Sequence, residues 1–91
     1  MVSPAPMSYV VECFWSGVRQ EDLLDLNRRI MAAMTDVAGG ADESAYRGSI
    51  LVLDDEVVLC LFDGPLATVR RVVERAGVPY ERILRATRAE V

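Results

Sequence analysis

The chain has 91 residues, a formal net charge of −4, and no His or Lys, so all ten basic residues are Arg. This length indicates one domain with a hydrophobic core, and the negative charge disfavours nucleic acids and anionic membranes as partners. The absence of His and Lys excludes a Ser-His-Asp triad and Schiff-base chemistry on a side chain.

Residues 1–7 form a proline-containing leader that we predict to be disordered, and residues 8–91 are predicted to form one domain. The start of the chain has neither the basic residues nor the apolar stretch of a secretory signal. No apolar run approaches the ~20 residues of a membrane span. These features predict a cytoplasmic protein.

The first predicted strand is Ser8 to Trp15, which is rich in aromatic and β-branched residues. Because successive side chains of a strand point to opposite faces, Glu12 shares a face with Val10 and Phe14, and Cys13 lies on the other. Both faces are mostly apolar, which indicates that both are covered. Glu12 is the exception, a carboxylate among apolar neighbours.

A helical period replaces the strand from about Arg19 to Ala38, and Gly39-Gly40 ends it. Acidic residues near the start suit the positive end of the helix dipole. The predicted buried stripe of this helix consists of Leu23, Leu24, Leu26, Ile30, Met31, Met34 and Val37.

Three more strands are predicted in the second half of the chain. Tyr46 to Leu53 and Glu56 to Phe62 are joined by a tight turn at Asp54-Asp55, and the last strand runs from Tyr80 to about Thr87. The hairpin strands, like the first strand, are apolar on both faces.

A second helix is predicted between the hairpin and the last strand. Pro65 suits its first turn, Gly77 suits its C-terminal cap, and Pro79 prevents its continuation. Its predicted buried stripe consists of Leu66, Val69, Val72, Val73 and Ala76.

The resulting order, βαββαβ, predicts an α+β fold of the ferredoxin-like type with an antiparallel four-stranded sheet. Two helices cover only one face of such a sheet, yet the strands are apolar on both faces. We therefore expect a second copy of the chain to cover the other face. The predicted homodimer is an α+β barrel with a central cavity between the two sheets.

Three segments resemble a bacterial nickel-binding-protein-like family of small proteins. They are Tyr9-Val10-Val11-Glu12, Leu-Cys-Leu-Phe-Asp-Gly-Pro at 59–65, and Ala-Gly-Val-Pro-Tyr-Glu-Arg-Ile at 76–83. The resemblance spans residues 8–87 and implies a ferredoxin-like fold that pairs into a dimeric α+β barrel. It also implies metal binding or storage as an alternative function.

The resemblance carries over to individual positions only in part. Glu12, Cys60 and Asp63 match the family pattern, and the match suggests that the face of Cys60 lines the cavity. Relatives often have a His before a Ser in the second strand, whereas this chain has Gly48-Ser49. Gly48 offers no ligand atom on a side chain, so no metal ligands are predicted.

Glu12 is the first candidate for a functional residue. If it faces the cavity, its apolar neighbours would raise its pKa and suit it to acid–base catalysis. The alternative is a structural ion pair with an arginine such as Arg47 or Arg85.

Cys60 alternates with Val58 and Phe62, so these three side chains share a face. A cavity thiolate could act as a nucleophile, a redox sensor or a soft metal ligand, and the alternative is a small core residue. The alternation of the strands places Cys13 on the other side from Cys60, which disfavours a disulfide or a shared metal between them.

Tyr46 is expected on the same face as Gly48 and Ile50. Gly48 in mid-strand indicates either a β-bulge or room for a ligand. Tyr46 would then orient a polar group of the ligand, or pack as an aromatic residue at the edge of the core.

These observations predict a homodimer that binds a hydrophobic or aromatic small molecule, as a binding protein or as an enzyme without a cofactor. Cyclisation, isomerisation or oxygenation would suit such a cavity by analogy with other dimeric α+β barrels. The predicted catalytic residues are Glu12 and Tyr46. The predicted ligand-binding residues are Val10, Phe14, Gly48, Ile50, Val58, Cys60, Phe62 and Arg85.

Overall fold

The computed structural model describes residues 8–38 and 44–87, and both the leader and the glycine pair after the first helix lie outside these ranges. The predicted elements are confirmed, with ends displaced by one or two residues. In chain order they are β1 (Ser8–Phe14), α1 (Gln20–Ala38), β2 (Ala45–Val52), β3 (Val57–Asp63), α2 (Leu66–Arg75) and β4 (Arg82–Ala86).

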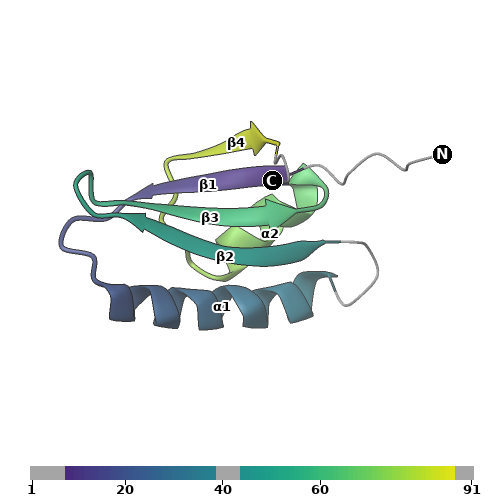
Figure 1. The fold of residues 1–91 in the computed structure, drawn as a ribbon. Helices are drawn as coiled ribbons and strands as arrows, with labels where there is room; N and C mark the ends of the chain where they lie inside the picture. The colour runs from purple at the N-terminus through teal and green to yellow at the C-terminus, as the bar shows by residue number, and fades with distance from the viewer. Residues whose placement is uncertain (1–7, 39–43, 88–91) are drawn as a thin grey trace.

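The strands form a four-stranded sheet in the order β2-β3-β1-β4, and each neighbouring pair is antiparallel. Figure 1 shows α2 behind the sheet and α1 running alongside β2. This arrangement confirms the predicted ferredoxin-like α+β fold. Strands β1 and β3 lie in the centre of the sheet and each pairs with a neighbour on both sides. They therefore position the two edge strands, β2 and β4.

The core lies between the sheet and the helices. Its fully buried side chains come from every layer, and they are Val11, Cys13, Leu26, Ile30, Val58, Cys60, Phe62, Val69, Val72 and Val73. We call the side of the sheet that faces this core the inner face. Burial of each such aliphatic side chain contributes about 1.5–3 kcal/mol, so this cluster is the main source of stability.

The helical stripes were predicted only in part. In α1, Leu24 and Met31 are 58% and 54% exposed, so the buried stripe is narrower than predicted. In α2, Leu66 is also exposed, at the first position of the helix. The apolar period of a helix predicts too wide a buried stripe when some of the apolar side chains lie at the edge of the side that packs on the sheet.

The predicted end of α2 is confirmed in detail. Gly77 adopts a φ of 70°, and its N–H donates to the carbonyl of Glu74 at 3.2 Å. The N–H of Val78 donates to the carbonyl of Val73 at 2.9 Å, and Val78 is buried. These two bonds form a Schellman motif, in which glycine supplies the left-handed conformation.

The hairpin between β2 and β3 contains a β-bulge. The register of the pair shifts between Tyr46 and Gly48, and Gly48 has a φ of 104°. Gly48 therefore marks a bulge, one of the two outcomes that its mid-strand position suggested. At the other end of β2, Glu56 adopts a φ of 52° in the turn, a conformation that costs energy for a residue with a Cβ.

The second face of the sheet, which we call the open face, is apolar and is not covered by either helix. Phe14 is 60% exposed and Ile50 is 49% exposed, on strands β1 and β2. Val10 and Glu12 lie on the same face of β1, opposite Leu61 and Leu59 of β3. The prediction that the strands are apolar on both faces is confirmed, whereas the second copy stays a prediction.

Candidate small-molecule site on the open sheet face

A hollow of about 530 Å³ lies on the open face, at the end where the β2–β3 hairpin turns. All four strands and the β2–β3 hairpin turn contribute to its wall. The lining residues are Glu12, Phe14, Val52, Asp55, Val57, Leu59 and Arg82. Four of these side chains are apolar and three are charged, so the wall combines apolar surface with ionic groups.

Glu12 is the charged centre of this hollow. Its side chain is only 14% exposed, and its carboxylate accepts from Arg82 Nε at 2.8 Å and from Arg82 Nη2 at 3.4 Å. The two residues are directly paired across β1 and β4, which holds the guanidinium in line with the carboxylate. The hydrogen bond to this carboxylate raises the pKa of Arg82, because it favours the charged guanidinium.

The alternative prediction for Glu12 was a structural ion pair with an arginine such as Arg47 or Arg85. The ion pair is present, but its arginine is Arg82. Arg47 donates from Nε to Asp63 at 2.8 Å, at the opposite end of the sheet. Arg85 is paired in register with Tyr9, one residue out of phase with Glu12. Arg82 was missed because the sequence does not reveal the register between β1 and β4.

Four of the predicted ligand-binding residues lie on the open face with Glu12. Val10 and Phe14 flank it on β1, while Gly48 and Ile50 are paired with the open-face residues of β3. Of these, Phe14 lines the hollow itself. Asp55, a residue of the predicted tight turn, also lines it.

The prediction that Cys60, Val58 and Phe62 line the same cavity is wrong. Cys60 and Val58 are completely buried and Phe62 is 2% exposed, all within the core beneath the helices. Cys60 is paired with Val11 of β1, which is an inner-face residue. The prediction for Arg85 is also corrected, since its register phase places it on the inner side, with Tyr9.

Tyr46 was also placed on the wrong face, and the bulge explains the error. The extra residue at the bulge reverses the alternation, so Tyr46 is paired with Phe62 while Gly48 is paired with Leu61. The rings of Tyr46 and Phe62 lie 4.9 Å apart between centroids. Tyr46 is therefore an aromatic residue of the core margin, and it does not reach the hollow.

Tyr46 belongs to a separate polar cluster beside α1. Its hydroxyl donates to Asn27 Oδ1 at 2.5 Å, and Ser49 Oγ donates to the same oxygen at 2.9 Å. Burial and the neighbouring Cys60 thiol raise the pKa of Tyr46 well above its ordinary value. The phenol is thus held neutral, which suits a hydrogen-bond donor that ties β2 to α1.

Cys13 and Cys60 lie on the same side of the sheet, which corrects the predicted separation. Register pairs Cys13 with Val58 and Cys60 with Val11, so the two cysteines are diagonal neighbours on β1 and β3. Both are free thiols in the core. The contact with Cys13, together with burial, raises the pKa of Cys60, which makes it an unreactive thiol at neutral pH.

The donor set does not fit a nickel site. Glu12 faces the open side and Cys60 faces the core, so the sheet separates two of the three residues that match the resembled family. Gly48 provides no side-chain ligand atom. Within residues 8–38 and 44–87, no group of three or more His, Cys, Asp or Glu side chains is arranged to hold a metal ion.

Comparisons with known proteins support the fold. No family model matches the chain, and no curated protein matches it. The crystal structure of SCO4226 from Streptomyces coelicolor A3(2) superimposes with a TM-score of 0.73 at 20% sequence identity, covering 91% of this chain and 99% of that one. In the described part of the chain, no helix is long and apolar enough to cross a membrane.

Proposed function

We propose that this protein is a homodimer whose two open faces enclose a cavity for a hydrophobic or aromatic small molecule. The observation that carries the proposal is the hollow on the open face, where the largely buried carboxylate of Glu12 pairs with the exposed Arg82 beside apolar side chains. The sequence resemblance, which implies a dimeric α+β barrel, points in the same direction.

The exposed apolar surface supports the second copy. Phe14, Ile50 and Leu84, from β1, β2 and β4, are each more than a third exposed on the open face. Contiguous apolar surface of this kind marks an interaction site in soluble proteins. Face-to-face packing of two identical sheets would remove it from water and turn each hollow into part of a closed cavity.

The ion pair supports a ligand with one polar group. Arg82 uses two of its nitrogens on Glu12, and 62% of its side chain remains exposed, so N–H donors remain available to a ligand acceptor. The apolar wall would bind the rest of the molecule. If the cavity carries out a reaction, Glu12 is the group placed to transfer a proton there, without a cofactor.

The two core thiols support a reducing compartment for this function. Cys13 and Cys60 are free although they are diagonal neighbours in the core. Proteins of oxidising compartments commonly use such cysteines in disulfides. We therefore propose that the homodimer works in the cytoplasm.

Sedimentation velocity tests the dimer. We expect the wild-type protein to sediment as a dimer at micromolar concentration and the Ile50→Asp variant as a monomer, because a carboxylate would be buried between the sheets. Leu24→Asp is the matched control, since Leu24 is similarly exposed but lies on α1. A wild-type monomer at high micromolar concentration would exclude the proposal.

A thermal-shift screen tests the ligand. We expect aromatic or apolar compounds with one hydrogen-bond acceptor to raise the melting temperature of the wild type, and Arg82→Gln to reduce that shift. A uniformly flat response across a broad metabolite panel would contradict small-molecule binding. For any substrate found in this way, unchanged turnover by Glu12→Gln would exclude an acid–base role.

A further inference from the structure

The open face carries two ion pairs, one at each end of the sheet. Glu12 and Arg82 form the pair at the hairpin end, and Arg47 Nε lies 2.8 Å from Asp63 Oδ2 at the opposite end. Asp63 is paired in register with Ser8, which shares the face of Glu12 on β1, so the second pair also belongs to the open face. The opposite charges within each pair cancel.

Asp55 adds a negative charge that no arginine of its own chain offsets. It is exposed in the β2–β3 turn, lines the hollow, and has no ion-pair partner among the described residues. Since Arg47 and Arg82 are each matched by a carboxylate, the described residues of the open face keep one net negative charge. Two stacked copies therefore enclose two such charges, and this total is the same for every orientation of the sheets.

This net charge discriminates between ligands. In an enclosed cavity of low dielectric constant, a negative wall attracts a cation and repels an anion more strongly than it does in water. A carboxylate bound to Arg82 would lie in the same hollow as Glu12 and Asp55, so like charges would oppose its binding. The acceptor that suits Arg82 is therefore a neutral oxygen, such as that of a hydroxyl or carbonyl group.

Phe14 is a second feature of the hollow that suits a cation. Its ring is 60% exposed and lines the hollow together with Asp55. An ammonium group is attracted by the face of an aromatic ring as well as by a carboxylate. The apolar part of the same ligand would lie against Val52, Val57 and Leu59.

We propose that the ligand of the cavity is a hydrophobic or aromatic amine that also carries a neutral hydrogen-bond acceptor. This ligand class rests on the proposed function, because the homodimer supplies the enclosed cavity. The ammonium group donates to Asp55, Arg82 donates to the neutral acceptor, and the apolar wall binds the rest of the molecule.

Three compounds that share a phenyl ring and a benzylic hydroxyl test this preference by isothermal titration calorimetry. They are phenylethanolamine, which is a cation at neutral pH, styrene glycol, which is neutral, and mandelate, which is an anion. We expect phenylethanolamine to bind the wild type about tenfold more tightly than styrene glycol, because it adds a charge-assisted hydrogen bond. Mandelate should bind most weakly.

Two variants of the hairpin turn locate the preference. Asp55→Asn should bind phenylethanolamine and styrene glycol about equally and should remain a dimer in sedimentation velocity. Asp54→Asn is the matched control and should keep the preference, because Asp54 has the same charge in the same turn but does not line the hollow. Equal losses in the two variants would overturn the contact with Asp55, and so would a monomeric Asp55→Asn, which would place this residue in the dimer interface.

The ligand class and the proposed function fail in different ways. If the wild type binds styrene glycol or mandelate as tightly as phenylethanolamine, the amine is overturned and the small-molecule cavity stands. A metabolite panel that yields only neutral or acidic ligands has the same meaning, as does a dimeric wild type that binds none of the three compounds but responds to other members of the panel. A flat response to the whole panel overturns both proposals.

Discussion

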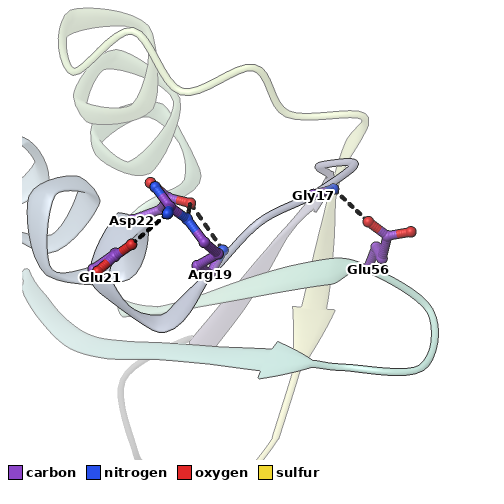
Figure 2. A network of polar contacts seen from close by, with 5 residues as sticks. All are labelled: Gly17, Arg19, Glu21, Asp22 and Glu56. Carbon is purple, nitrogen blue, oxygen red and sulfur yellow. Dashed lines mark hydrogen bonds and ion pairs between the residues drawn. The ribbon is translucent and has the colours of Figure 1, made fainter.

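Glu56 joins the β2–β3 hairpin turn to the loop between β1 and α1, through both its side chain and its backbone. Its carboxylate accepts a hydrogen bond from the N–H of Gly17, and its carbonyl accepts from the N–H of Trp15 at 3.0 Å. Figure 2 shows this contact beside the start of α1, where the N–H of Arg19 donates to Asp22 at 2.8 Å. The hairpin thus fixes the loop from which the first helix begins.

Two substitutions at Glu56 separate its hydrogen bond from its backbone strain. We expect Glu56→Ala to lower the free energy of unfolding by about 1 kcal/mol, because the bond is lost and the positive φ stays. Glu56→Gly should be nearly neutral, since glycine relieves about 1 kcal/mol of that strain. Urea unfolding measures both, and equal losses would show that the backbone conformation contributes nothing.

Tyr46 predicts how stability depends on pH. Its pKa in the folded protein is raised above the ordinary value of 10.0, so the folded state binds the phenol proton more tightly than the unfolded state does. This contribution is complete below pH 10 and is lost as the pH rises above it, because the unfolded chain ionises first. We therefore expect the free energy of unfolding to fall above pH 10.

Tyr46→Phe is the control for this pH dependence. The variant should be about 1 kcal/mol less stable at pH 7, because the bond to Asn27 is lost. Above pH 10 its stability should fall less steeply than that of the wild type. Parallel curves from urea unfolding across this pH range would show that Tyr46 titrates normally.

At the scale of elements, Gly48 and Gly64 both have a positive φ, but different physical factors restrict substitution at the two positions. A Cβ at Gly48 would meet no atom within 4 Å, so only the φ of 104° restricts that position. A Cβ at Gly64 would lie 2.9 Å from the Cα of Ser44, in addition to a φ of 124°. The bulge is thus limited by backbone conformation, whereas the β3–α2 turn is limited by both conformation and space.

We expect this difference to appear in alanine variants. Gly48→Ala should cost about 1–2 kcal/mol for the backbone conformation alone. Gly64→Ala should cost about 3 kcal/mol or more, because backbone atoms of the neighbouring segment must also move. Thermal or urea unfolding compares the two, and a greater loss for Gly48→Ala would contradict this account.

The helices and strands could be predicted from the sequence. The face of the sheet on which each side chain lies could be predicted only in part. The periods of β1 and α2 and the Pro65 and Gly77 signals were sufficient, because these are local properties of the chain. The face of Tyr46 was wrong because a single inserted residue reverses the alternation of β2. The Glu12–Arg82 pair depends on register between strands 70 residues apart, which no local pattern encodes.

At the scale of the whole molecule, one sheet face packs on the helices and the other remains apolar. A two-layer domain needs only one covered face, so the exposed Phe14 and Ile50 have no role in the fold of a single copy. This excess of apolar surface links the fold to the proposed function. It also means that the stability of the protein should depend on association.

We therefore expect the melting temperature to rise with protein concentration. For a dimer that dissociates on unfolding, a hundredfold increase in concentration adds about 2.7 kcal/mol per dimer. Shared between two chains of this size, this corresponds to a rise of about 5 °C or more. Differential scanning calorimetry measures the shift. Ile50→Asp should melt at one temperature at all concentrations, whereas Leu24→Asp should shift like the wild type; a concentration-independent wild type would show that the apolar face is not a dimer interface.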